Sequence, residues 1–178
     1  MMTTALVVEN HPLYRQGLSD LLRTTLDRPK VIGANSVEAV FHSAASKLAV
    51  KLIVLDSVLP GLSGAGAIRA LLDRYGHAAL VAVSASEDRR DAAAALRAGA
   101  RAFVSKSVSN EVLGDTVLRV LTGRLTKPEW ITPEGVREVL EYPGPELTQR
   151  QRQVLALIRR GYTNKEIGLH LKRLTGQV

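Results

Sequence analysis

The chain has 178 residues, with 24 Lys or Arg against 17 Asp or Glu and a net charge of +7. It has no cysteine, which excludes disulfide frameworks and thiolate zinc sites. No apolar run reaches the length of about 18 residues that a membrane-spanning helix needs, and the N-terminus lacks the order of a secretory signal, so we expect a cytoplasmic protein without a membrane partner.

Residues 1–124 alternate short apolar runs with amphipathic stretches, which is the pattern of β-α units on a parallel sheet. The run over residues 52–55 is apolar at every position, as expected of a strand covered on both faces. Five such units with right-handed crossovers predict an α/β fold with a (βα)5 doubly wound parallel sheet. The strands are expected at residues 5–8, 31–32, 52–55, 79–83 and 102–104, and the helices from Pro12, over 37–45, 67–74 and 88–98, and from a cap at Ser109 to 121.

Residues 125–146 are rich in proline and contain five glutamates, which indicates a linker, with a possible helix from Pro133 to Leu140. Two capping-box patterns then follow, Thr-Gln-Arg-Gln at 148–151 and Thr-Asn-Lys-Glu at 163–166. They predict a small all-α unit over residues 147–178. This unit holds seven basic residues and one acidic residue, which is typical of a surface that faces phosphates, although a solvated helix face explains it equally well.

Polar residues stand where the predicted parallel strands end. Ligands of such sheets bind outside the carboxyl ends of the strands. Two carboxylates, an amide, a hydroxyl and an ammonium at that edge suit phosphoryl transfer, in which an aspartate can attack phosphorus and the other groups neutralise charge. A single polar strand end would carry little weight, but four at the expected places favour a site. The residues are Glu9, Asn10, Asp56, Ser84 and Lys106.

Four segments in order resemble the receiver domain of response regulators of the NarL/FixJ type. They are residues 9–18, 55–61, 84–85 and 98–106. Residues 147–148, 153–155, 161 and 163–167 resemble the front of a LuxR-type helix-turn-helix. The resemblance covers nearly the whole chain and implies a CheY-like, flavodoxin-like receiver over residues 1–124, a linker over 125–146 and a partial DNA-binding helix-turn-helix over 147–178.

The resemblance also implies roles for individual residues. The chain would be a regulator of transcription in a two-component system and not an enzyme. A sensor histidine kinase would be the phosphoryl donor, and a homodimer would form through the fourth helix, fifth strand and fifth helix. The implied site residues are Asp56 as phosphoacceptor, Glu9, Asn10 and Asp56 around Mg²⁺, Ser84 and Lys106 on the phosphoryl oxygens, and Phe103 as the switch aromatic.

Asn10 departs from the family pattern, which has at this position the acid that ligates the metal directly. An amide oxygen can coordinate Mg²⁺ but brings no negative charge. One charge about 4 Å away is worth roughly 4 kcal/mol at an effective dielectric near 20, before desolvation offsets much of it. Because about 1.4 kcal/mol already corresponds to a factor of ten, we expect weak Mg²⁺ binding.

The C-terminal residues 175–178 resemble the start of the recognition helix, and the chain stops there. The second helix of this motif reads bases in the major groove. We therefore expect phosphate contacts at most from this 178-residue chain, without specific operator binding, which would belong to a full-length relative. The residues expected to contact DNA phosphates are Asn164, Lys165, Lys172 and Arg173.

Three other interpretations remain open from the sequence. A pseudo-receiver would act as a phosphorylation-independent interaction or dimerisation module; Asn10 favours it, while the intact Asp56, Ser84 and Lys106 oppose it. An aspartate-nucleophile hydrolase needs a second acid two residues after the nucleophile, where this chain has Val58. A nucleotide-binding module is less compatible still, because the glycines at 61, 64 and 66 do not have the required spacing.

Overall fold

The computed structural model describes residues 3–137. The chain divides into two units, Met1–Glu141 and Tyr142–Val178, and all the described residues belong to the first. The predicted helices of residues 147–178 and the predicted DNA-contacting residues, Asn164, Lys165, Lys172 and Arg173, lie outside the described residues. In the part of the chain that is described, no helix combines the length and the apolar character needed to cross a membrane.

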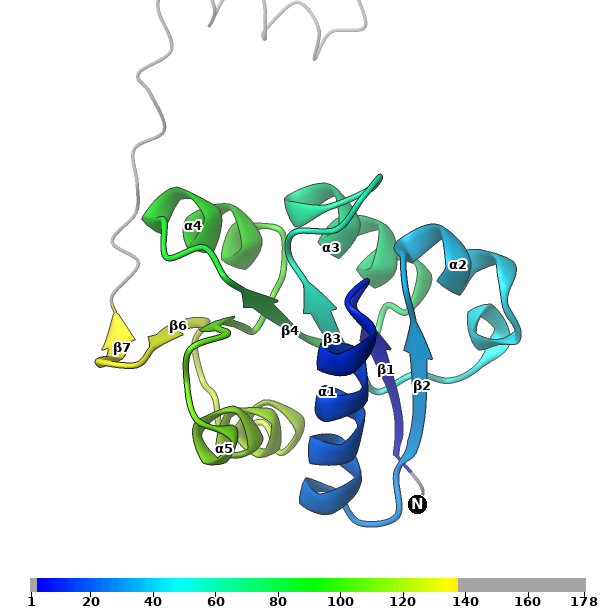
Figure 1. Cartoon of the computed structure of the whole chain (residues 1–178), viewed down its shortest axis with the longest axis horizontal. Helices are drawn as coiled ribbons and strands as arrows, with labels where there is room; N and C mark the ends of the chain where they lie inside the picture. The colour runs from blue at the N-terminus through cyan, green and yellow to red at the C-terminus, as the bar shows by residue number, and fades with distance from the viewer. Residues whose placement is uncertain (1–2, 138–178) are drawn as a thin grey trace, which may run out of the picture. The chain divides into compact units, whose positions relative to one another are not determined.

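A seven-stranded sheet with the order β2-β1-β3-β4-β5-β6-β7 forms the centre of the receiver (Figure 1). All neighbouring pairs from β2 to β6 are parallel, and β7 pairs with β6 in the antiparallel direction. The first five strands therefore confirm the predicted doubly wound fold. The strands are β1 (Thr4–Val8), β2 (Lys30–Ala34), β3 (Leu52–Asp56), β4 (Ala79–Ser84), β5 (Ala102–Ser105), β6 (Glu129–Thr132) and β7 (Gly135–Arg137).

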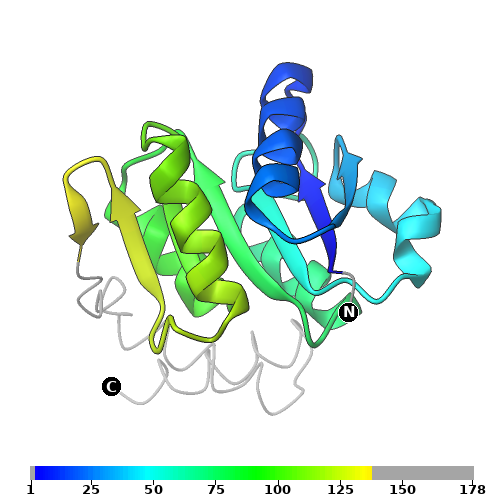
Figure 2. The ribbon, with the colours of Figure 1, turned by 90° about the horizontal axis from the view of Figure 1, so that it is seen from below.

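Five α-helices cover the two faces of the sheet. Helices α1 and α5 lie on one face, and α2, α3 and α4 lie on the other (Figures 1 and 2). The helices are α1 (Pro12–Thr25), α2 (Val37–His42), α3 (Gly64–Arg74), α4 (Arg89–Arg97) and α5 (Asn110–Leu121), with a short 3₁₀ helix, η1 (Ala44–Lys47), after α2. The helix predicted over residues 37–45 is thus interrupted at Ser43, whose side chain caps η1 by accepting from the Ala45 N–H.

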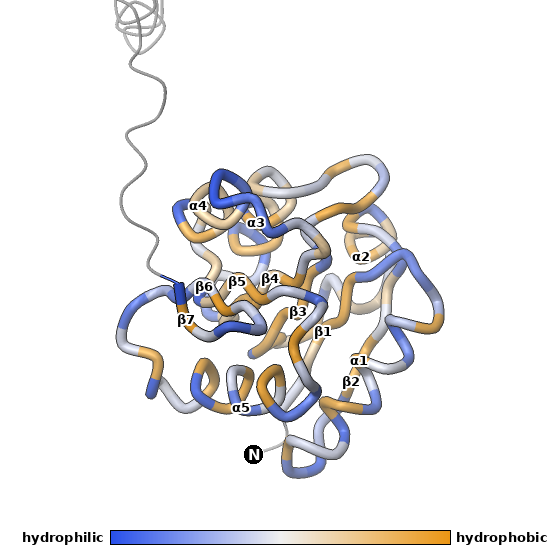
Figure 3. Tube along the Cα trace, turned by 60° about the vertical axis from the view of Figure 1, so that its left-hand side comes forward, coloured by the Kyte–Doolittle hydropathy of each residue, from blue (hydrophilic) through white to orange (hydrophobic). Residues whose placement is uncertain are grey.

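Two hydrophobic clusters, one on each face of the sheet, form the core. Alternate residues of a strand point to opposite faces, so Leu6 and Val8 belong to the cluster under α2–α4, while Ala5 and Val7 belong to the cluster under α1 and α5. Every residue of β3 is buried, as its apolar sequence predicts. Figure 3 shows the hydrophobic colouring concentrated along these strands. Full burial of a Val or Leu side chain contributes about 1.5–3 kcal/mol to the stability of the fold, so the buried central strands stabilise the sheet strongly.

Side chains at the helix starts fix the loops that follow the strands. Ser36, Asp88 and Ser109 accept hydrogen bonds from backbone N–H groups in the first turns of α2, α4 and α5. The Arg90 side chain and backbone, both donating to the Asp88 carboxylate, lower the pKa of Asp88 to about 2. Because these caps satisfy otherwise unpaired N–H groups, each helix begins at a defined residue beside the end of its strand.

The linker prediction was wrong over the described part of residues 125–146. Instead of a helix from Pro133, residues 129–132 form β6 and residues 135–137 form β7. The physical reason is the adjacent pair Trp130 and Ile131, which buries one side chain in each of the two clusters and so extends both cores. Pro133 lies in the turn between the strands, and Gly135 adopts a φ of +120° that favours glycine.

We predict that Gly99→Ala destabilises the receiver. Gly99 follows α4 with a φ of +114°, and a Cβ there would lie 2.6 Å from Leu72 Cδ1. Backbone strain and steric overlap together should lower the free energy of unfolding by about 1–3 kcal/mol, measured by urea denaturation. Gly17→Ala is the matched control: a Cβ at Gly17, in the middle of α1, meets no atom within 4 Å, and the change should stabilise by about 0.5–1 kcal/mol. Equal stability of the two variants would contradict the prediction.

Candidate functional site

The carboxyl ends of β1, β3, β4 and β5 bring the predicted site residues to one edge of the sheet. Glu9 directly follows β1, Asp56 is the last residue of β3, Ser84 is the last of β4, and Lys106 directly follows β5. Glu9, Asp56 and Ser84 are buried. The sheet topology explains this convergence, because the four strands are parallel and adjacent in the order β1-β3-β4-β5.

The ammonium of Lys106 lies between two buried carboxylates. Its Nζ is 2.7 Å from Glu9 Oε2 and 2.8 Å from Asp56 Oδ2. The Glu9 side chain is 0% exposed and that of Asp56 is 5% exposed, whereas the Lys106 side chain is 21% exposed. Unpaired buried charges are costly, so the lysine is required to compensate the two acids.

The pKa of Lys106 lies above its usual value. Burial of the ammonium acts to lower this pKa and is the largest single influence. The hydrogen bonds and negative charges of Asp56 and Glu9 together act in the opposite direction and outweigh burial. Lys106 therefore stays positively charged throughout the neutral pH range.

Backbone N–H groups orient each carboxylate. The His11 N–H donates to Glu9 Oε1 at 2.7 Å, and the Val58 N–H donates to Asp56 Oδ1 at 2.9 Å. Each acid therefore uses one oxygen for the backbone and directs the other towards Lys106. Such charge-assisted bonds hold a side chain in one geometry, which a nucleophile for an in-line attack requires.

Ser84 and Asn10 differ in how closely they are held. Ser84 is fully buried, and its Oγ accepts from the Ser86 N–H at 3.0 Å, so the hydroxyl proton remains available for another acceptor. Asn10 is exposed beside Glu9, and its backbone carbonyl oxygen accepts from Arg15 Nη1 at 3.3 Å. Arg15 Nη1 also donates to the Glu9 carbonyl at 2.6 Å, which fixes the backbone after β1.

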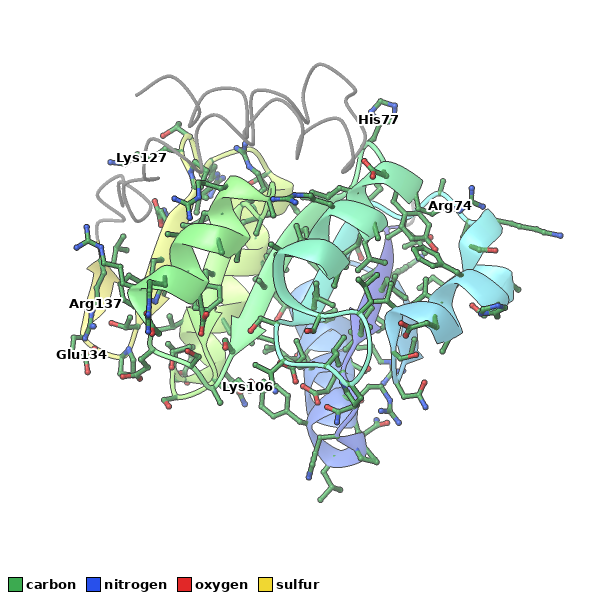
Figure 4. All side chains as sticks on the ribbon, turned by 90° about the horizontal axis from the view of Figure 1, so that it is seen from above. Arg74, His77, Lys106, Lys127, Glu134 and Arg137 are labelled. Carbon is green, nitrogen blue, oxygen red and sulfur yellow. The ribbon has the colours of Figure 1, made fainter. Side chains whose placement is uncertain are left out.

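Tyr14 contributes to the site, although no role was predicted for it from the sequence. The Lys106 Nζ lies 4.5 Å from the centroid of the Tyr14 ring, within range of a cation–π interaction. Burial raises the pKa of the Tyr14 phenol; Lys106 opposes this, and Glu9 and Asp56 add to it. An aromatic residue in the first turn after Pro12, at the carboxyl end of β1, was the only sequence signal. Figure 4 shows Lys106 close to the start of α1.

Phe103, the predicted switch aromatic, lies in the core on β5. Its side chain is 0% exposed, and it belongs to the cluster under α2–α4. In the sheet register Phe103 is paired with Ala82 of β4 on one side and with Trp130 of β6 on the other. The pairing of Phe103 with Trp130 was not expected, because residues 125–146 were predicted to form a linker.

The side chains around Asp56 offer a small set of oxygen donors to a divalent cation. The described residues contain no group of three or more His, Asp or Glu side chains suited to a metal ion. They do contain two carboxylates close enough to share one ammonium, with an amide next to them. Mg²⁺ is usually held by one or two carboxylates together with waters and phosphate oxygens, so the residues fit this ion as a small donor set.

Residues 5–118 match the model of the response regulator receiver domain family. The chain belongs to this family. The nitrate/nitrite response regulator NarL of Escherichia coli K12 is 29% identical over 94% of this chain and 80% of its own length. VraR of Staphylococcus aureus NCTC 8325 is 27% identical, with the same two shares covered.

Solved structures show the same fold. A LuxR family DNA-binding response regulator from Silicibacter pomeroyi is 29% identical and superposes with a TM-score of 0.59 over 68% of this chain and 93% of that chain. RcsB, in a structure of two dimers bound to two DNAs, is 19% identical with a TM-score of 0.68, covering 97% of this chain and 84% of that chain. The family and the relatives identify a response regulator of the NarL/LuxR type, which controls transcription in two-component systems, and do not favour a phosphorylation-independent module.

We predict that Lys106→Met destabilises the receiver by about 2–4 kcal/mol, since it leaves two buried carboxylates without their cation. The expected destabilisation is smaller than for the loss of a fully buried ion pair, because the Lys106 side chain is partly exposed. Adding Asp56→Asn should recover part of the loss, because it removes one of the two charges and can keep the Val58 hydrogen bond. Chemical denaturation of both variants and of Asp56→Asn alone gives the coupling, and strictly additive effects would contradict the prediction.

Proposed function

We propose that Asp56 accepts a phosphoryl group from a sensor histidine kinase and that the resulting acyl phosphate switches the receiver between two states. The observation that carries this proposal is the geometry of Asp56, a buried carboxylate oriented by a backbone N–H and directed at the ammonium of Lys106. A purely structural ion pair would not need a second buried acid, Glu9, on the same ammonium. In this proposal the chain acts as a switch and not as an enzyme.

The transfer step follows from the chemistry of the residues present. A carboxylate oxygen of Asp56 attacks the phosphorus of a phosphohistidine, an O–P bond forms, and the P–N bond breaks with its electron pair passing to the imidazole nitrogen. Lys106 moves from the carboxylate to a phosphoryl oxygen and keeps that charge compensated. The Ser84 hydroxyl, which uses only an acceptor position in its bond from the Ser86 N–H, donates to a second phosphoryl oxygen.

Glu9, Asp56 and the side-chain oxygen of Asn10 are the residues that would hold Mg²⁺. A bound Mg²⁺ would neutralise charge on the phosphoryl oxygens during transfer. Lys106 competes for the same two carboxylates, and Asn10 adds no charge of its own. Both features support weak metal binding.

Three partners complete the proposal. The sensor histidine kinase is the phosphoryl donor. A homodimer would use the face at α4, β5 and α5; because β6 pairs with the outer edge of β5 and β7 pairs with β6, these two strands form part of that face. DNA is contacted through the C-terminal residues, where Asn164, Lys165, Lys172 and Arg173 supply phosphate contacts; the excess of basic residues in that part of the sequence supports this assignment.

The test of the phosphoacceptor is incorporation of phosphate from a small-molecule phosphodonor such as acetyl phosphate at saturating Mg²⁺. Intact mass should increase by one phosphoryl group, and Asp56→Asn should abolish the increase, because an amide is not a nucleophile for phosphorus. Asp88→Asn is the matched control, since Asp88 caps α4 outside the site, and it should be phosphorylated like the original chain. Phosphate on the Asp56→Asn chain, or none on the original, would contradict the proposal.

The metal proposal predicts the effect of Asn10→Asp. The added carboxylate beside Glu9 should tighten Mg²⁺ binding by about tenfold or more, as one recovered charge interaction of roughly 1.4 kcal/mol implies. Calorimetric titration with MgCl₂ measures the affinity. Asn110→Asp adds the same charge at the exposed start of α5 and should change the affinity far less. Equal Mg²⁺ affinities of the original chain and the Asn10→Asp chain would show that Asn10 does not limit metal binding.

A further inference from the structure

The β6–β7 hairpin, residues 129–137, lies between α5 and the C-terminal residues in the sequence and along the outer edge of β5 in the sheet (Figure 2). β5 is therefore an interior strand, and β6 is its neighbour on the side away from β4. Every signal that passes along the chain from the receiver to residues 142–178 passes through this hairpin. The contacts that hold the hairpin on β5 therefore determine how the receiver is connected to the C-terminal residues.

Backbone pairing and two polar contacts dock β6. Phe103 is in register with Trp130, and Val104 with Ile131. The Arg119 guanidinium of α5 donates to both carboxylate oxygens of Glu129, at 2.8 and 3.0 Å. The Arg101 guanidinium donates to the Leu125 carbonyl at 2.8 Å, which fixes the approach to β6.

Trp130 is held differently. Its side chain is buried with Phe103 under α4, and Arg137 lies over the ring at 5.2 Å from the centroid. Its indole Nε1 is buried and has no hydrogen-bond partner among the described residues. A buried donor without an acceptor disfavours the state that buries it, so docking of Trp130 rests on apolar packing against a penalty.

The phosphoacceptor site is connected to this strand through β5. Lys106 directly follows β5 and now contacts Asp56 Oδ2, the position that an acyl phosphate would change. A phosphoryl group on Asp56 would draw Lys106 to a phosphoryl oxygen, and a backbone shift that accompanied this movement would act on the end of β5, which Lys106 directly follows. Since β5 has only β4 and β6 as sheet neighbours, such a shift would reach β6 through the pairs Phe103–Trp130 and Val104–Ile131.

We propose that the β6–β7 hairpin is the output element of this receiver, docked on β5 when Asp56 is unmodified and loosened when Asp56 is phosphorylated. This inference rests on the proposed function of Asp56. Coupling between two sites is reciprocal, so a change that weakens docking of the hairpin must favour the phosphorylated state by the same factor.

The first test uses Trp130, which is the only tryptophan of the chain, as a fluorescent reporter. The full chain is treated with beryllofluoride, a phosphoryl mimic, at saturating Mg²⁺, and in parallel with acetyl phosphate. We expect a shifted Trp130 emission, amide exchange at residues 129–131 faster by about fivefold or more, and no change in Asp56→Asn. Phosphate on Asp56 with unchanged emission and exchange would overturn this inference alone; absence of phosphate would overturn the proposed function and this inference with it.

The second test uses reciprocity. Glu129→Gln weakens the bond to Arg119 without touching the site residues, and it should tighten beryllofluoride binding by about two- to fivefold. Glu134→Gln is the control, because Glu134 pairs with Arg137 within the hairpin and is exposed; the affinity should stay the same. Figure 4 shows Glu134 and Arg137 at the outer edge of the sheet, away from Lys106. An unchanged or weakened affinity in Glu129→Gln would overturn the coupling.

Discussion

Two buried carboxylates and one ammonium meet at the carboxyl end of the sheet, and the arrangement of the receiver is built around this charge balance. Glu9 and Asp56 end adjacent parallel strands, so the topology forces two negative charges together inside the protein. Lys106 comes from β5, which is separated from β3 by β4, and only its long side chain lets it reach both acids. The same contact links β5 to the chemical state of Asp56, because a new anion at Asp56 competes for the ammonium of Lys106, which directly follows this strand.

The site could be predicted from the sequence because its residues follow from strand ends. Apolar runs located β1, β3, β4 and β5, and the polar residue after each run had to lie at the common edge of a parallel sheet. The starts of α2, α4 and α5 can also be predicted from the sequence, since Ser36, Asp88 and Ser109 are residue types that cap helices with their side chains. The role of Tyr14 could not be predicted from the sequence, because the direction of its ring relative to Lys106 depends on how α1 packs on the sheet.

The sixth and seventh strands could not be predicted for a different reason. Their apolar signal is the pair Trp130 and Ile131 in β6 and the single Val136 in β7, which is too short to distinguish strands from turns, and the flanking prolines indicated a linker. Strand formation here depends on a long-range partner: the edge of β5 leaves backbone groups to be paired, and each face of the sheet leaves a core to be extended. Periodicity within the segment carries no information about that partner.

The docked hairpin changes what Phe103 can do. On an edge strand an aromatic side chain can turn towards solvent at little cost to its neighbours. In this receiver β6 covers that edge, and Phe103 is enclosed between Ala82 and Trp130 in the register of the sheet. A close-packed interior accommodates a displaced ring only if a neighbour moves as well. The Trp130 side chain is held by apolar packing, since its indole N–H has no partner among the described residues, and the β6–β7 hairpin that carries it precedes the C-terminal part of the chain.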